Sequence, residues 1–381
     1  MRPFRTLLGV VSMAALGCAS ADPAPAPASP APAPTGPAAS TPPGPTPVPE
    51  PAAPEAPSDA CLGPALPITI AGGLPYVTVR VGTSPAAADG AFLLDLATTR
   101  STIDLAAFTP RPKAIGCDPS RLGERCTFHG FDFFGDWGDV LLSTADHEGY
   151  GAGVVRPAGI LGTDLLARAV FTLDYVAKTV RRAEEASRCD EDQLAALGFA
   201  PLSSAGFYAT STAGLAPLSS VVSDASPNVR VPNVPSVPLR IGGATAPVQL
   251  DTGFDDYLYP LSINVNEAFF AAITKASPKA LVRTPSRDLS LSTCAGVAEA
   301  VEAYVLASGS EVALVDEAGD RPFSATDATI FVKRTPAAAR VCGGIGTWSA
   351  PAAQVGATLF ARLGATVFDP FASRVWVRKA P

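Results

Sequence analysis

Two aspartates, Asp95 and Asp251, stand at the same place in two similar segments of the 381-residue chain. Each follows a short, mainly apolar run, at residues 92–94 and 248–250. A short continuous run of this kind is typical of a strand that is buried on both faces. Carboxylates can act as general acids or general bases. The two aspartates are therefore the first candidates for chemistry in this sequence.

Other common catalytic and metal-binding patterns do not occur in the sequence. The chain has two histidines, His129 and His147, which argues against a multi-histidine metal site and against a Ser-His-Asp triad. His147 begins a zincin-like motif, but Gly151 stands where that motif needs a second histidine. The sequence contains no G-x-S-x-G elbow and no G-x-x-x-x-G-K-[ST] loop, and the glycine group at 343–346 predicts a hairpin turn. We expect neither a metal ion nor a cofactor.

The elements before each aspartate follow one pattern. Residues 77–95 and 237–251 each contain a β-rich run, a glycine-containing turn and a second apolar run that ends in aspartate. This pattern predicts a β-hairpin in both places.

The elements after each aspartate also repeat. Segment 159–175 contains Ile160-Leu161-Gly162, and segment 354–370 contains Gln354-Val355-Gly356 at the matching place. In both, the pattern then predicts a short helix and a strand that ends in aspartate. Another strand follows in both cases, and such long-range repetition specifies architecture. We place the boundary of the two units near Cys189. The charge-free stretch 193–223 predicts strand and loop structure.

This order of elements resembles that of the aspartic proteases, both the two-lobed pepsin-like enzymes and the single retropepsin-like lobes. The resemblance covers most of residues 66–379, and Asp251-Thr252-Gly253 is the family triplet. The segment GILGTDLLARAVFTLDY at 159–175 is similar to the end of a family lobe. The resemblance implies an all-β fold of two pepsin-like (retropepsin-like) β-barrel lobes, related by internal duplication, with short helices.

The resemblance implies that Asp95 and Asp251 form a catalytic pair. In the family, two carboxylates about 3 Å apart share one proton because both cannot ionise. The ionised carboxylate activates a water molecule, and the protonated one donates a hydrogen bond to the scissile carbonyl. The positions that match the supporting turn and cleft residues of the family are Thr98, Thr252, Gly253, Asp255, Gly162 and Gly356.

The first turn departs from the family pattern at Leu96 and Ala97. A Thr or Ser at the second position of the triplet forms hydrogen bonds across the lobe interface, which Thr252 can do and Leu96 cannot. A glycine at the third position lets the backbone approach the carboxylates, whereas Ala97 adds a methyl group. The alternative to an active enzyme is therefore a degenerate lobe pair, in which Asp95 is a turn aspartate without catalytic function.

An active family member also needs a flap, a hairpin with an aromatic residue over the cleft. Trp137, in Gly135-Asp136-Trp137-Gly138, is the flap candidate, with Phe133, Phe134 and Tyr150 as other aromatic residues of the region. A half-buried core position is the alternative for Trp137.

The first 17 residues are typical of a secretory signal peptide. Arg2 and Arg5 precede an uncharged apolar run at 7–16, which is too short to span a membrane. Cys18 directly follows Gly17, as in a bacterial lipobox, and we expect it to be lipidated. The order Ala15-Leu16-Gly17-Cys18 differs from the usual one, so ordinary cleavage nearby stays the alternative. Residues 18–60 then form a Pro/Ala-rich disordered linker.

Six further cysteines suit an exported chain with disulfide bonds. Six cysteines allow 15 connectivities. Proximity in the sequence favours Cys117–Cys126 and Cys294–Cys342. The remaining pair, Cys61–Cys189, ties together the two ends of the first lobe.

Composition bounds the partners and the place of action. The formal net charge is −7, which argues against a nucleic-acid-binding protein. We expect a signal peptide at 1–17, a lipid-anchor cysteine and linker at 18–60, and aspartic-protease-like lobes at 61–190 and 191–381. We expect a monomer in the bacterial cell envelope, with the outer membrane favoured, that contacts the membrane only through its lipid anchor. Its function is either endopeptidase activity in the inter-lobe cleft, or binding of a peptide or envelope protein there without turnover.

Overall fold

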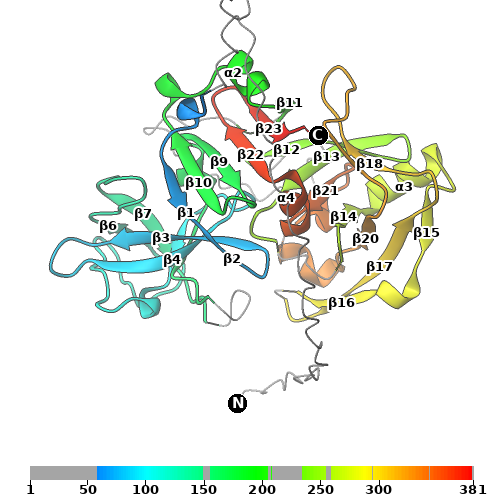
Figure 1. Cartoon of the computed structure of the whole chain (residues 1–381). Helices are drawn as coiled ribbons and strands as arrows, with labels where there is room; N and C mark the ends of the chain where they lie inside the picture. Colours follow the sequence, from blue (N-terminus) through cyan, green and yellow to red (C-terminus); the bar gives the residue numbers. More distant parts are fainter. Residues whose placement is uncertain are drawn as a thin grey trace, which may run out of the picture. The chain divides into compact units, whose positions relative to one another are not determined.

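The computed structural model describes residues 58–148, 155–204, 207, 234–254, 259–293, 295–342 and 344–379. These residues belong to one compact unit, Glu55–Pro381. The described part of the chain is all-β with short helices (Figure 1). The predicted fold class is therefore confirmed at the level of an all-β architecture.

The first half of this unit forms a seven-stranded sheet among the described residues. Its strands, in order across the sheet, are β2 (Thr69–Ala71), β3 (Leu74–Val81), β4 (Ala88–Leu94), β8 (Gly159–Leu161), β5 (Thr102–Ile103), β7 (Val140–Thr144) and β6 (Arg125–Phe128). β3 and β4 form the predicted antiparallel hairpin. β4 ends at Leu94, so Asp95 lies at the edge of the sheet.

The described residues of the second half form a ten-stranded sheet. Nine of its strands lie in the order β15 (Leu281–Arg283), β17 (Ala298–Leu306), β20 (Thr329–Lys333), β14 (Ser262–Asn266), β21 (Ala353–Val355), β13 (Ala244–Leu250), β12 (Ser236–Ile241), β18 (Val312–Leu314) and β19 (Phe323–Ala325). β16 (Leu289–Ser292) pairs with β17. β12 and β13 form the second predicted hairpin, and Asp251 directly follows β13.

The two sheets use the same pairings around the aspartates. β4 runs parallel to β8, as β13 runs parallel to β21. β8 is antiparallel to β5, as β21 is antiparallel to β14. β5 is parallel to β7, as β14 is parallel to β20. The strands that precede and flank the two aspartates are therefore held in equivalent ways.

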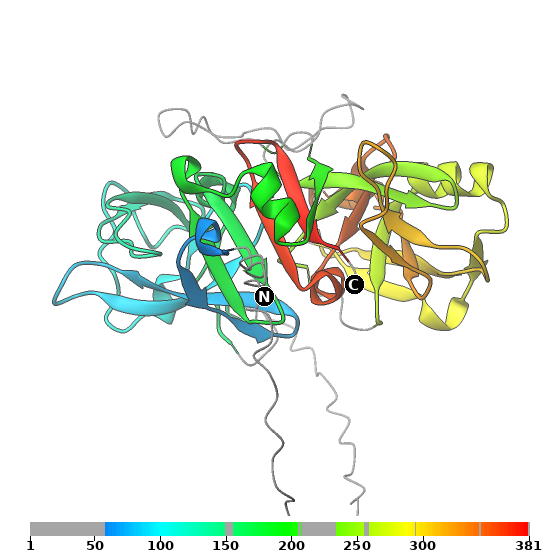
Figure 2. The same cartoon turned by 45° about the horizontal axis from the view of Figure 1, so that its top comes forward.

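A six-stranded sheet joins the two halves. Its strands, in order, are β1 (Ala65–Pro67), β10 (Thr179–Ala183), β9 (Val170–Asp174), β22 (Ala365–Asp369), β23 (Arg374–Arg378) and β11 (Phe199–Ser203). β9 and β22 pair antiparallel at its centre, from Ala365 opposite Asp174 to Phe368 opposite Phe171. Figure 2 shows the green β9–β10 pair beside the red β22–β23 pair.

Short helices connect strands within and between these sheets. α1 (Thr163–Leu166) and α4 (Ala357–Leu363) follow the apolar segments of the two halves, as the sequence predicts. α3 (Glu267–Ala276) begins after Asn266, whose side chain accepts a hydrogen bond from the Phe269 N–H. No helix among the described residues is both long enough and apolar enough to cross a membrane.

Two local predictions were wrong. The stretch that begins at Gln193 was expected to be strand and loop, but α2 (Glu191–Ala196) extends into it before β11. Asp190 and Gln193 form a reciprocal capping box, which stabilises this helix start. The glycine group near 343 does not mark a hairpin turn: the described residues there form 3₁₀ turns at Ala337–Cys342 and Ile345–Thr347.

Among the described residues there are two disulfide bonds, Cys61–Cys189 and Cys117–Cys126, and both were predicted. The Cys294–Cys342 prediction lies outside the described side chains, as do the signal peptide, Cys18 and the linker to residue 57. The lobe boundary at 190/191 stays a prediction.

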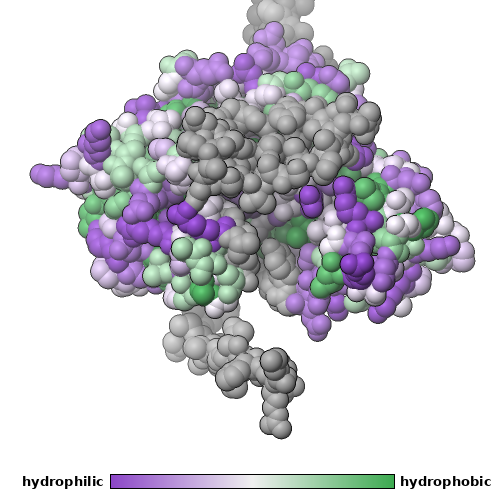
Figure 3. Space-filling view, turned by 180° about the vertical axis from the view of Figure 1, so that it is seen from behind, coloured by the Kyte–Doolittle hydropathy of each residue, from purple (hydrophilic) through white to green (hydrophobic). Residues whose placement is uncertain are grey.

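Few large apolar side chains are exposed on the described surface. On the face in Figure 3, purple hydrophilic residues surround scattered green ones. The large apolar side chains that are exposed come from separate elements and loops: Leu122, Leu141, Val176, Val282 and Leu291. Exposed apolar side chains scattered in this way are ordinary for a protein surface and do not mark a docking site.

Candidate functional site

The Asp95 turn closes on its own carboxylate. The Asp95 N–H donates to the Leu161 carbonyl at 2.9 Å, which anchors the turn to β8. Asp95 Oδ1 accepts hydrogen bonds from the Ala97 N–H at 2.9 Å and from the Thr98 N–H at 3.2 Å. Aspartate commonly stabilises a turn by such bonds to the following backbone. The bond from Thr98 to the carboxylate comes from its backbone N–H.

The Asp251 turn is anchored to its sheet in the same way, but its carboxylate accepts hydrogen bonds from different donors. The Asp251 N–H donates to the Val355 carbonyl at 2.9 Å, and Asp251 Oδ1 accepts from the Gly253 N–H at 2.9 Å. Asp251 Oδ2 accepts from the side-chain amide of Gln354, with Nε2 at 2.5 Å. Both oxygens of this carboxylate therefore face N–H donors.

Thr252 connects the two turns. Its hydroxyl donates to the Leu94 carbonyl at 2.7 Å and accepts from the Leu96 N–H at 3.0 Å. The Thr252 side chain is fully buried, so water does not compete for these bonds. Leu96 is also buried, but its side chain packs into the apolar core. The side chain of Thr252 therefore links the two turns, and the Leu96 side chain does not return a hydrogen bond.

Gly253 lies against the carboxylate of Asp95. A Cβ atom built on Gly253 would stand 2.5 Å from Asp95 Cγ and 2.5 Å from Asp95 Oδ2. Only a residue without a side chain fits this approach. Since the N–H of Gly253 also donates to Asp251, the backbone of this one residue contacts both carboxylates. The structure thus brings Asp95 and Asp251 together around Gly253.

Gly162 and Gly356 support the two turns in matching ways. A Cβ atom on Gly162 would meet the Thr98 carbonyl oxygen at 2.8 Å, and one on Gly356 would meet the Phe254 carbonyl oxygen at 2.3 Å. Thr98 and Phe254 each stand three positions after an aspartate. Both glycines therefore allow an apolar strand end to pack directly on an aspartate turn.

Burial changes the titration of Asp95. The side chain is 8% exposed, and burial raises its pKa from an ordinary 3.8 to about 6. The N–H groups of Ala97 and Thr98 oppose this shift, because they favour the ionised carboxylate. A carboxyl group with such a pKa holds its proton in mildly acidic solution, as a general acid requires.

Gln354 is a site residue that the sequence analysis missed. Its Oε1 accepts a hydrogen bond from Asn264 Nδ2 at 3.2 Å, while its Nε2 donates to Asp251. The available signal was an amide in the apolar segment before Gly356, where the first half has Ile160.

The other predicted site residues have different outcomes. Asp255 and Tyr150 lie outside the described residues. The indole of Trp137 lies under the guanidinium of Arg182, 4.7 Å from its carbon, and 5.9 Å from the Phe133 ring. These contacts are those of a half-buried core aromatic, and a flap role for Trp137 stays a prediction.

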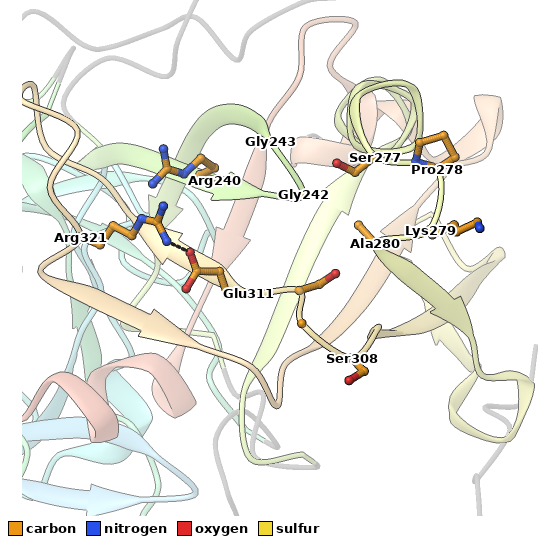
Figure 4. Close-up of a pocket in the computed structure, with 12 residues that line it drawn as sticks. Arg240, Gly242, Gly243, Ser277, Pro278, Lys279, Ala280, Ser308, Glu311 and Arg321 are labelled. Atoms are coloured by element: carbon orange, nitrogen blue, oxygen red, sulfur yellow. Dashed lines mark hydrogen bonds and ion pairs between the residues drawn. The ribbon is translucent and has the colours of Figure 1, made fainter.

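A cavity of about 700 Å³ lies elsewhere in the second half (Figure 4). It is bordered by the β12–β13 turn, by the segment after α3 and by the β17–β18 loop. Its charged lining residues are Arg240, Lys279, Glu311 and Arg321, of which the last two form an ion pair. None of its lining residues belongs to the aspartate turns, so it is separate from them.

Comparisons with known proteins give little direct information. No protein-family model and no curated protein matches the sequence. One similar solved structure is basic 7S globulin from soybean, with 13% sequence identity and a TM-score of 0.42. The match covers 83% of this chain and 94% of that chain. The site is defined by the strand pairings and hydrogen bonds of the two aspartate turns.

Proposed function

We propose that this chain is an exported aspartic-protease-like protein and that Asp95 and Asp251 hydrolyse peptide bonds through an activated water molecule. The observation that carries the proposal is the linked pair of turns. Thr252 joins them, and Gly253 contacts both carboxylates. Two carboxylates in one site, one of them with a raised pKa, are the arrangement that acid–base hydrolysis needs.

In the proposed reaction, a water molecule lies between the two carboxyl groups. The ionised carboxylate accepts a proton from the water, and the water oxygen attacks the peptide carbonyl carbon. The protonated carboxyl group donates its proton to the carbonyl oxygen, which gives a neutral tetrahedral diol. The C–N bond then breaks, as one diol proton returns to a carboxylate and the nitrogen receives the other carboxyl proton. An acid, an amine and the original pair of carboxyl groups remain.

The wider assignments belong to the same proposal. Residues 1–17 are a signal peptide, Cys18 is the lipid-anchor cysteine, and residues 18–60 are a linker that carries lobes 61–190 and 191–381. The matching pairings of the two sheets support internal duplication, and the two disulfide bonds support an oxidising compartment. The protein acts as a monomer anchored in the bacterial cell envelope, with the outer membrane favoured.

A second candidate function is peptide or envelope-protein binding without turnover. Leu96 and Ala97 favour it, because they leave the first turn without the clamp residue and without the glycine of the second turn. The same site then holds an extended peptide, and Asp95 acts only as a hydrogen-bonding group.

Cleavage of a diverse peptide mixture by the full chain, from acidic to neutral pH, tests the proposal. Cuts are expected that disappear in the Asp251→Asn variant and in the presence of a statine-type inhibitor. Thr172→Val, a buried change in β9 away from both turns, is the control and should keep the activity. A folded parent that produces no cuts at any pH rules out the protease and favours the binding function.

A further inference from the structure

Three residues with amide side chains stand opposite one another on neighbouring strands close to Asp251. In the sheet registers, Gln354 on β21 stands opposite Gln249 on β13 and opposite Asn264 on β14. Gln249 and Asn264 are buried, and Gln354 is partly buried. We call Gln249, Gln354 and Asn264 the amide row. Buried amides need hydrogen-bond partners, and the row provides some of them internally.

Two hydrogen bonds fix the direction of Gln354. Asn264 Nδ2 donates to Gln354 Oε1 at 3.2 Å, so the Gln354 oxygen faces Asn264. Gln354 Nε2 then faces Asp251 Oδ2, at 2.5 Å. An ionised carboxylate can only accept hydrogen bonds, so this orientation suits a charged Asp251. The chain Asn264–Gln354–Asp251 therefore delivers an N–H donor to one defined oxygen.

The first half has no amide row at the equivalent positions. There, Ile160 stands opposite Leu93 on β4 and opposite Thr102 on β5. Leu93 and Ile160 belong to an apolar cluster with Leu74 and Tyr76. The residue that corresponds to Gln354 is thus an aliphatic one, and the described donors to Asp95 are backbone N–H groups.

We propose that Gln354 is a positioning residue that holds Asp251 as the ionised member of the pair and so leaves Asp95 as the proton carrier. This inference rests on the proposed function for its catalytic meaning, because it makes Asp251 the base that activates water and Asp95 the acid. It also explains why the two aspartate turns can be matched in backbone yet differ in their surroundings. When the environments of two carboxyl groups push their pKa values apart, the group with the higher pKa is the acid and the other is the base.

Replacement of Gln354 by methionine tests the inference. Met has a similar length and volume but no N–H donor, so it removes the bond with little change in packing. The readout is the site-resolved titration of the Asp95 and Asp251 carboxyl carbons by NMR in the full chain. In Gln354→Met, the midpoint of Asp251 should move up by about 1 pH unit, since a hydrogen bond to a charged group is lost.

The matched control is Ile160→Met at the equivalent place in the first half. It removes no donor and should leave the midpoint of Asp251 unchanged. In the parent, Asp251 must ionise at a lower pH than Asp95. The reverse order overturns the inference even if the variants fail to fold, and so does an unchanged Asp251 midpoint in folded Gln354→Met.

Peptide cleavage separates this inference from the proposed function. If the parent cleaves peptides, Gln354→Met should move the acidic limb of the pH–rate profile upward by the same amount as the Asp251 titration, which a purely structural defect would not do. If the parent cleaves nothing, the proposed function fails. The titration of Asp251 then still decides whether Gln354 holds that carboxylate in its ionised form.

Discussion

At the residue scale, the buried carboxyl group of Asp95 couples site chemistry to folding. Its pKa is raised to about 6 in the folded chain, so the folded state holds a proton that the unfolded chain loses near pH 4. The protonated Asp95 therefore contributes its full share of the unfolding free energy below about pH 4. This contribution declines as the pH rises and is lost once the pH has passed about 6.

The Asp95→Asn variant should remove this dependence, because an amide does not ionise. Its unfolding free energy should exceed that of the parent by about 3 kcal/mol at pH 7, and the two should converge near pH 4. Urea denaturation at both pH values measures the difference. Acidic groups distant from Asp95 cancel in the comparison, since they are the same in both chains. A constant difference across this range would contradict the burial-raised pKa.

The close approach of Gly253 to Asp95 gives another prediction. Gly253→Ala forces a methyl group to within 2.5 Å of the carboxyl carbon, so we expect a loss of about 1–3 kcal/mol of unfolding free energy. Ala97→Gly, the reverse change in the first turn, removes a methyl group and should cost less than about 1 kcal/mol. Thermal or urea denaturation compares the two variants, and equal effects would argue against the contact.

At the element scale, Thr252 is the hydrogen-bonded link between the turn after β4 and the turn after β13. Thr252→Val keeps the shape but leaves the buried Leu96 N–H and Leu94 carbonyl without this hydroxyl. Each unsatisfied group costs about 1–3 kcal/mol, so we expect a loss of about 3 kcal/mol or more in urea denaturation. Thr252→Ser keeps the hydroxyl and should lose clearly less. A valine variant as stable as the serine variant would refute the link.

Much of the element order could be predicted from the sequence, because the signals are local. The two hairpins, α1, α4 and the strands that follow them come from apolar runs bounded by Gly and Asp. The one-sided link of the turns follows from Thr252 and Leu96 once the turns are taken to face each other. The helix at Glu191 differs from the predicted strand and loop, because the capping box of Asp190 and Gln193 starts a helix just before the charge-free residues.

The amide row could not be predicted, because it depends on register. Gln249, Asn264 and Gln354 come from three strands, and only the pairings of β13, β14 and β21 place them side by side. A single Gln in an apolar segment gives no sign of its partner about 100 positions earlier in the chain. Likewise, nothing in the local pattern shows that β9 pairs with β22.

At the scale of the whole molecule, the two described disulfide bonds constrain the chain very differently. Cys61–Cys189 joins residues 128 positions apart, whereas Cys117–Cys126 closes a separation of 9. Loop-closure entropy predicts that replacing the first pair by alanines costs about 5 kcal/mol and the second about 3 kcal/mol. Thermal unfolding of the two double variants should rank them in that order. The opposite ranking would show that local packing outweighs chain entropy here.

The six-stranded sheet can form fully only after strands from both halves of the chain have been synthesised. β9 is synthesised with the first half of the chain, but its partner β22 follows only after the strands of the second sheet. Until then, β9 presents an open row of backbone hydrogen-bonding groups, the kind of edge that recruits other chains. If synthesis stops before residue 365, one edge of β9 therefore stays unpaired and can bind other chains. Once β22 has been synthesised, it pairs with β9 and covers this edge.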